Sequence, residues 1–175
     1  MMDDKVLAGT SNSVVDFCGR EWRFDCMGCA VVGGVIDLPG GKAYESDSVV
    51  LATDPAIPIP GFLIVNSKRH IKSFADLTEA ERHEMVDVVA AAEKALRELG
   101  IAQEFTIVQE ERSPHFHIWI FPYSGWMEER FGKGVTHLRA ILDYAKENST
   151  TEIVQETIDA VKKVKTYFDE HGINA

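Results

Sequence analysis

Two histidines alternate with large apolar residues in the stretch "SPHFHIWIFP" (113–122). In an extended strand, His115 and His117 would point to the same face, with about 6.5 to 7 Å between them. A neutral imidazole can act as a nucleophile toward phosphorus or as a zinc ligand. The spacing therefore fits a catalytic strand, a metal-binding strand, or a core strand that carries two satisfied histidines.

Two of the three cysteines, Cys26 and Cys29, form the motif "CMGC". Two thiolates at this spacing suit one zinc ion or one redox disulfide. The third cysteine, Cys18, makes the count odd, which argues against a disulfide scaffold in a chain without a secretion signal. A single C-x-x-C indicates zinc only when further ligands lie elsewhere in the chain.

Composition limits the kinds of partner that the chain could bind. The 175 residues are 45% hydrophobic, which fits one domain. The net charge of −10 makes nucleic acid an unexpected partner, because binding to its backbone needs clustered basic residues. A small anion would need a local positive pocket, for which "NSKRH" (66–70) and Arg112 are the candidates. The chain has neither a membrane-length apolar run nor a secretory signal, so we expect a cytoplasmic protein without a membrane partner.

The histidines must be positioned by a sheet and a long helix. The segment 77–100 has helical spacing of apolar residues, a capping box from Thr78 and Glu81, and Gly100 at its end. One face of this helix is expected to lie on the sheet. Turn signals and β-branched residues predict short strands at 14–19, 29–38, 48–54, 61–67, 104–110 and 115–121.

The last two strands are joined by a short link that predicts an antiparallel hairpin. The period of two places Phe116, Ile118 and Ile120 on one face, and His115, His117, Trp119 and Phe121 on the other. We expect the apolar set to meet the helix and the histidine set to face a ligand. The tail predicts helices at 135–148 and 149–172, the second with a capping box from Ser149 and Glu152.

These motifs follow one another in a specific order. The order is "CMGC" (26–29), "AYESDSVVLATD" (43–54), "DPAIPIPGFLIVNSKRH" (54–70), the 77–100 helix and "HFHIWIFP" (115–122). It resembles the histidine triad (HIT) family of nucleotide hydrolases and transferases, in particular its zinc-containing bacterial branch of dinucleoside polyphosphate hydrolases. The resemblance covers residues 26–122.

The resemblance implies an α+β fold, with an antiparallel sheet of about five strands and a long helix packed on it. The helical C-terminal extension lies outside the resemblance and is predicted from the periodicity of the tail. Residues 1–125 would form the HIT-like domain, and residues 126–175 the extension of that same domain. The family usually pairs two copies through the long helix and an edge strand, so the resemblance also implies a homodimer.

The resemblance also implies roles for single residues. Cys26, Cys29, His70 and His115 match the ligands of a structural zinc ion. His117 matches the nucleophile that attacks the α-phosphorus of a nucleotide and forms a nucleotidyl-histidine intermediate. Asp54 matches the acidic residue that holds the ribose hydroxyls.

The chain also departs from the family pattern. Trp119 stands in place of the third histidine, which gives a degenerate triad H-F-H-I-W, and an indole donates one hydrogen bond but cannot shuttle a proton. Phe62 replaces the histidine of the "PGH" motif. The glycine-rich stretch before the histidine strand is replaced by "QEERSP" (109–114). The available nucleotide contacts are then Gln109, Arg112, Ser113 and Trp119.

The function expected from the resemblance is a nucleotide phosphohydrolase or nucleotidyl transferase that acts on dinucleoside polyphosphates or related nucleotide conjugates. An alternative is a catalytically impaired HIT-fold module that binds a nucleotide or a protein. A third interpretation is that only the zinc-stapled scaffold is kept and that the pocket serves an unrelated ligand.

Overall fold

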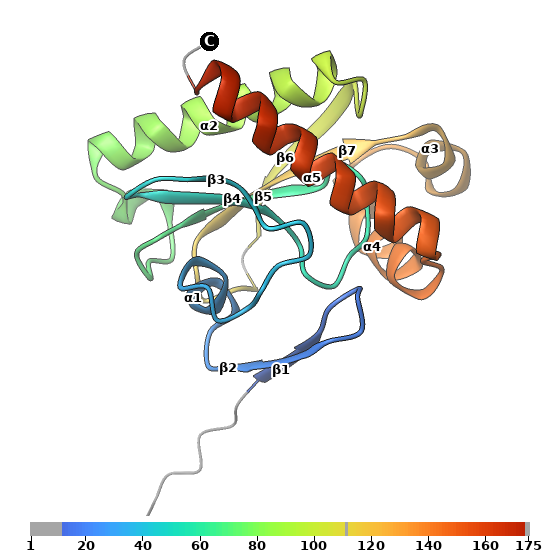
Figure 1. Cartoon of the computed structure of the whole chain (residues 1–175), viewed down its shortest axis with the longest axis horizontal. Helices are drawn as coiled ribbons and strands as arrows, with labels where there is room; N and C mark the ends of the chain where they lie inside the picture. The colour runs from blue at the N-terminus through green and yellow to red at the C-terminus, as the bar shows by residue number, and fades with distance from the viewer. Residues whose placement is uncertain (1–11, 111, 174–175) are drawn as a thin grey trace, which may run out of the picture.

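The computed structural model describes residues 12–110 and 112–173. Its centre is a five-stranded antiparallel sheet with the strand order β3-β4-β5-β7-β6 (Figure 1). The strands are β3 (Lys42–Glu45), β4 (Val49–Thr53), β5 (Leu63–Ser67), β6 (Glu104–Gln109) and β7 (His117–Tyr123). A separate hairpin, β1 (Asn12–Val15) and β2 (Glu21–Phe24), precedes the sheet. The expected α+β fold is therefore confirmed.

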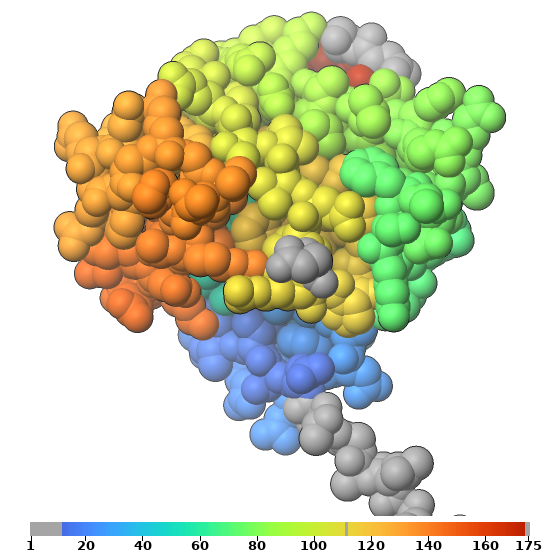
Figure 2. Space-filling model, turned by 180° about the vertical axis from the view of Figure 1, so that it is seen from behind, coloured from blue at the N-terminus to red at the C-terminus, as the bar shows by residue number. Residues whose placement is uncertain are grey.

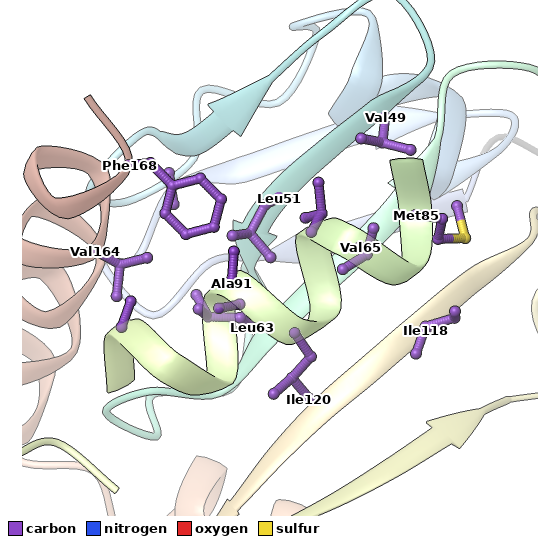
Figure 3. Packing of buried hydrophobic residues seen from close by; sticks show 14 of the residues in the cluster. Val49, Leu51, Leu63, Val65, Met85, Ala91, Ile118, Ile120, Val164 and Phe168 are labelled. Atoms are coloured by element: carbon purple, nitrogen blue, oxygen red, sulfur yellow. The ribbon is translucent and has the colours of Figure 1, made fainter. Parts of the chain in front are cut away.

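One face of the sheet is covered by two long helices, α2 (Glu79–Glu98) and α5 (Thr151–His171) (Figure 1). Ile118 and Ile120 point to this face, as the period of two predicts, and pack in the same cluster as Met85 of α2 (Figure 3). Val164 and Phe168 of α5 complete the cluster. The last helix of the tail is thus part of the main hydrophobic core.

The opposite face carries His117 and is covered from two sides. On the β4 side lie helix α1 (Met27–Val32) and the β1–β2 hairpin. On the β7 side lie α3 (Gly125–Phe131) and α4 (Leu138–Glu147). In Figure 2, seen from behind, the orange helices α3 and α4 and the blue N-terminal segment adjoin the yellow segment that contains β6. The elements on both sides leave His117 only 9% exposed.

Several local expectations were wrong. The segment 29–38 was expected to be a strand, but its first half belongs to α1, which ends at Gly33. A short apolar run fits a buried helix as well as a buried strand, and the two consecutive glycines stop the helix here. The cap of α5 is Thr150, whose Oγ1 accepts the N–H of Ile153 at 3.3 Å, and not Ser149. Strand β3 and helix α3 were not expected.

The start of α2 matches the sequence prediction. Thr78 Oγ1 accepts the N–H of Glu81 at 3.3 Å, and the Glu81 carboxylate accepts the N–H of Thr78 at 2.7 Å. The same carboxylate binds Arg69, with an oxygen–nitrogen distance of 2.6 Å. The loop that carries His70 is therefore tied to the first turn of α2. The remaining elements are two short 3-10 helices, η1 (Phe74–Asp76) and η2 (Val135–His137).

Among residues 12–173, apart from residue 111, no helix combines the length and the apolar character that a membrane crossing needs.

Candidate functional site

Four potential metal ligands converge at one end of the sheet. They are Cys26, Cys29, His70 and His115, and their ligand atoms all lie within 4.8 Å of one another. Cys29 Sγ is 3.1 Å from His70 Nδ1 and 3.4 Å from His115 Nδ1, and Cys26 Sγ is 3.7 Å from His115 Nδ1. With bonds of about 2.3 Å to sulfur and 2.0–2.1 Å to nitrogen, a tetrahedral zinc ion holds its ligand atoms at similar separations. The four residues therefore fit a zinc ion.

The local structure turns each of these side chains toward the others. Cys26 is the N-cap of α1 and Cys29 lies in its first turn, so one short helix presents both thiols. His115 Nε2 donates a hydrogen bond to the carbonyl oxygen of Ser67 at 2.6 Å. This bond fixes the proton on Nε2 and leaves the lone pair of Nδ1 directed at the thiols, as a metal ligand requires.

The ionisation of these groups also suits a cation. Burial lowers the pKa of His115, which keeps its imidazole neutral. Burial and the neighbouring Cys26 raise the pKa of the Cys29 thiol, because two adjacent thiolates repel each other. A divalent cation between the two thiols would remove that repulsion and favour the thiolate forms.

Gly28 controls how closely α1 approaches His115. A Cβ atom at this position would lie 2.3 Å from His115 Cγ, far closer than two carbon atoms can approach. The expectation from the sequence treated "CMGC" only as two thiols and missed this glycine. Its place between the two cysteines was the available clue, but the ring that it faces lies 87 residues further along the chain.

His117 begins β7 and is only 9% exposed. Its Nδ1 is 2.9 Å from the carbonyl oxygen of His115, to which it donates its proton. In the neutral imidazole this leaves the lone pair on Nε2. The fold therefore holds the ring in the tautomer and orientation that a nucleophile or a hydrogen-bond acceptor needs.

Asp54 follows the end of β4 on the same face. One of its carboxylate oxygens accepts the N–H groups of Ala56 at 2.7 Å and Ile57 at 3.1 Å. Burial raises the pKa of Asp54, and the hydrogen bonds from the backbone of Ala56 and Ile57 oppose that rise. Asp54 continues the alternation of Val50 and Ala52, whose side chains lie on the face of the sheet that α1 covers, the face that also carries His117.

The two residues that depart from the family pattern, Phe62 and Trp119, pack against each other. Their rings meet edge to face, with centroids 5.5 Å apart. The rest of their cluster comes from the sheet, the loop between β4 and β5, α3 and α4. Its buried members are Ile59, Ile64, Phe121, Met127, Leu138, Ile141, Leu142 and Ala145. The indole N–H of Trp119 has no hydrogen-bond acceptor in the part of the chain that the structure describes. At two positions where the family pattern has a histidine, this chain thus has aromatic residues that pack against each other beneath helix α4.

The other residues expected to contact a nucleotide are Ser113, Gln109 and Arg112. Ser113 Oγ accepts the N–H of His115 at 3.1 Å and so supports the histidine strand. Gln109 is exposed, with its amide 3.5 Å from the carbonyl oxygen of Lys72, and Arg112 is exposed, 3.9 Å from Glu110.

The basic stretch "NSKRH" is largely neutralised by acidic partners. The amine of Lys68 is 2.8 Å from a carboxylate oxygen of Glu45, and Arg69 binds Glu81. The positive charges that this stretch was expected to offer to an anion are therefore already paired with carboxylates.

One cation near His117 was missed by the sequence reasoning. The guanidinium carbon of Arg139, on α4, lies 5.1 Å from the centre of the Trp119 ring. The same guanidinium forms an ion pair with Glu110 at the end of β6. Nothing in the spacing of the tail indicated this contact, because it depends on how α4 crosses the sheet.

A cavity of about 770 Å³ lies apart from His117, at the other end of β7. It is lined by the loop 58–60, by the residues that follow α2, and by parts of α3, α4 and α5. Its aromatic wall includes Trp126 and Tyr144, whose ring centroids are 5.6 Å apart. This cavity therefore does not coincide with the histidine site.

Comparison with solved structures identifies the fold. A hypothetical histidine triad nucleotide-binding protein from Sulfolobus tokodaii superposes with a TM-score of 0.59 and 14% identity, over 84% of this chain and 97% of its own. A zinc-bound histidine triad family protein from Mycobacterium smegmatis gives 0.55 and 18%, over 81% and 96%. The chain has the histidine triad fold. A HIT-like protein involved in cell-cycle regulation from Bartonella henselae, solved with an unknown ligand, also gives 0.55 and 18%, over 80% and 96%.

At the level of sequence, no family model and no curated protein matches the chain. The likeness to histidine triad proteins is therefore one of fold, and the chemistry has to be argued from the residues of this chain.

Proposed function

We propose that this histidine triad fold binds a nucleotide beside His117 and acts as a nucleotide phosphohydrolase or nucleotidyl transferase. The observation that carries the proposal is the orientation of His117, whose Nδ1 proton is donated to the His115 carbonyl so that Nε2 keeps its lone pair. The neighbouring Asp54 would bind the ribose hydroxyls. The fold shared with a structure described as a nucleotide-binding protein supports the choice of ligand.

In the proposed reaction, His117 Nε2 forms a bond to the α-phosphorus while the bond from phosphorus to the bridging oxygen breaks. The bridging oxygen leaves with the electron pair as part of a nucleoside polyphosphate. Water then attacks the same phosphorus, breaks the phosphorus–nitrogen bond and loses its proton to solvent, which returns the free imidazole. Transfer to another acceptor would replace this water.

Trp119 narrows the class of substrate. An indole cannot deliver a proton to the leaving group, which the third histidine of the family pattern could do. A polyphosphate leaves as a stable anion and needs no proton, whereas an amine leaving group has to be protonated. We therefore propose dinucleoside polyphosphates as the better substrates and nucleoside phosphoramidates as the poorer ones.

We also propose that a structural zinc ion is bound by Cys26, Cys29, His70 and His115. The support is the donor set and its separations, together with the shared fold of a zinc-bound protein. A closed Cys₂His₂ site would fix the start of β7, and with it His117, without taking part in the reaction. Metal analysis of the purified protein should find about one zinc per chain.

A binding module without chemistry is the second candidate function. It is favoured by the packing of Phe62, Trp119 and α4, which leaves His117 only 9% exposed. Such a module would bind nucleotide without forming a covalent intermediate. The cytoplasmic location expected from the sequence stays a prediction.

The covalent intermediate separates the two candidates. The parent protein is incubated with diadenosine tetraphosphate, quenched without acid because a phosphorus–nitrogen bond is acid-labile, and analysed by peptide mass spectrometry. We expect an adenylyl group on His117 and turnover of the substrate, both lost in His117→Ala and both kept in His83→Ala, a change on the exposed side of α2.

Turnover that persists in H117A would contradict the assignment of the nucleophile. Nucleotide binding by the parent with neither adduct nor turnover would favour the binding module.

A further inference from the structure

We propose that Arg139 of helix α4 binds the phosphate chain of the nucleotide next to His117. This inference rests on the proposed function, because it concerns the same ligand. It goes further by naming a cation that no motif of the histidine strand supplies.

The position of Arg139 follows from the way α4 packs. Leu138, Ile141 and Leu142 are buried against the cluster that contains Phe62 and Trp119. Because these residues fix the helix, Arg139 has to emerge at the margin of the buried face. Its guanidinium lies over Trp119, and the Trp119 ring is 6.2 Å from the His117 ring. Only the Trp119 side chain therefore separates the guanidinium of Arg139 from the proposed nucleophile, His117.

The guanidinium is available to a ligand. The side chain of Arg139 is 45% exposed, and its ion pair with Glu110 involves one terminal nitrogen of a group that has five N–H donors. Nearly half of the Arg139 side chain is exposed, although that of Glu110 is only 10% exposed, so a phosphate can reach the N–H groups that Glu110 does not bind. Arginine suits this role because its planar fork matches phosphate oxygens.

The acidic groups around the proposed site would repel a phosphate chain, so its binding needs a nearby cation. The chain carries a net charge of −10, and Asp54 and Glu110 add negative charge on this side of the sheet. Of the cations expected from the sequence, Lys68 is paired with Glu45 and Arg69 with Glu81.

A second cation lies on the same side of α4 as Arg139. Lys146 follows seven residues later, which is about two helical turns, and its charge acts on Asp54. This side of α4 therefore carries two cations, Arg139 and Lys146.

The indole N–H of Trp119 is an independent sign of a missing acceptor. Trp119 is 6% exposed and its nitrogen has no partner within the described residues. Leaving a buried donor unpaired is costly, and an oxygen atom from a ligand would remove the cost. Because Arg139 lies over this ring, a phosphate drawn to the guanidinium arrives close to the unpaired donor.

Calorimetry with two probes, AMP and adenosine, tests the inference on the full chain. We expect Arg139→Gln to weaken AMP binding by about 10- to 100-fold and to leave adenosine binding unchanged, since a hydrogen bond to a charged group is worth that much. Arg130→Gln is the matched control: this arginine of α3 also lies over an aromatic ring, that of Tyr144 at 4.3 Å, and should bind AMP like the parent.

A change at Glu110 separates phosphate binding from a merely structural role. If phosphate and Glu110 compete for Arg139, Glu110→Gln should tighten AMP binding by about two- to fivefold. If the ion pair only holds α4 in place, E110Q should weaken AMP binding as R139Q does, and that result would overturn the proposal.

The outcomes also separate this inference from the proposed function. Equal AMP affinity in R139Q and the parent would overturn the role of Arg139, while an adduct on His117 in the parent would still support the proposed function. Loss of AMP binding in R139Q without any adduct in the parent would support Arg139 and a binding module. A parent that binds no AMP would overturn both.

Discussion

Gly28 allows a helix and a histidine ring to come close enough to share a metal ion. We expect Gly28→Ala to bind much less than one zinc per chain, because the added carbon would lie 2.3 Å from His115 Cγ and must push the ring away from the thiols. The crowding itself should lower the free energy of unfolding by about 1–3 kcal/mol. Metal analysis of the purified proteins measures the first effect, and urea unfolding of the metal-free proteins measures the second.

The control for this prediction is Gly125→Ala at the start of α3, where a Cβ would meet no neighbour within 4 Å. It should keep both the metal and the stability of the parent. Full zinc content in G28A would contradict the proposed ligand set.

At the scale of residues, the sequence was informative where it carried motifs. Cys26, Cys29, His70 and His115 meet as the resemblance to the histidine triad family implied. Arg139 could not be foreseen, since its contact with Trp119 depends on the angle at which α4 crosses the sheet. In the sequence, Trp119 and Phe62 are two separate replacements of histidines in the family pattern. Only the structure shows that the two side chains pack against each other.

At the scale of elements, helix α2 positions His70 through an ion pair. Arg69 precedes His70 and binds Glu81, which also caps α2. The Arg69 hydrogen bond is the main cause that lowers the pKa of Glu81 to about 2. Such a carboxyl stabilises the fold above its unfolded pKa, near 4.5, and loses that contribution as the pH falls toward about 2.

We therefore expect Glu81→Gln to lower the free energy of unfolding at pH 7 by about 0.5–1 kcal/mol, since the partner arginine is half exposed and glutamine can still cap the helix. The difference from the parent should shrink between pH 4.5 and about 2. Urea unfolding at pH 7, 4 and 3 measures it. A difference that stays constant with pH would show that the charge of Glu81 is not its cause.

The elements themselves were predictable where periodicity was long. The helical spacing over 77–100 correctly predicted α2 and its cap. The alternation at 115–121 correctly predicted which side chains of β7 point toward the helices. The segment 29–38 was misassigned because a short apolar run carries no distinct period. Helix α3 has only seven residues and begins with a glycine, so local propensity gave it no clear signature.

At the scale of the whole molecule, the tail is packed into the fold on both faces of the sheet. Helix α5 joins the main core through Val164 and Phe168, and α4 joins the cluster on the His117 face through Ile141. We therefore propose that residues 126–175 unfold together with residues 1–125 as one domain. The order of strands and the place of each helix follow from contacts between distant residues, which no local pattern encodes.

One edge of the sheet offers a surface for a second copy of the chain. Strand β6 is an outer strand, and Ile107 is paired with Ile120, so its side chain points to the face that α2 covers. Helix α2 packs against β4, β5 and β7, and Ile107 beside it remains 44% exposed. An exposed apolar edge strand favours pairing with another chain. We propose that two copies associate through β6 and α2.

Light scattering after gel filtration should then give twice the 19.5 kDa of one chain. Ile107→Lys should shift the protein to one copy, because a charged residue on an edge strand opposes pairing. Val135→Lys is the control, since Val135 is 62% exposed in η2 on another part of the surface and should leave the mass unchanged. A parent protein with the mass of one chain would contradict the dimer, and a dimer that persists in I107K would place the interface elsewhere.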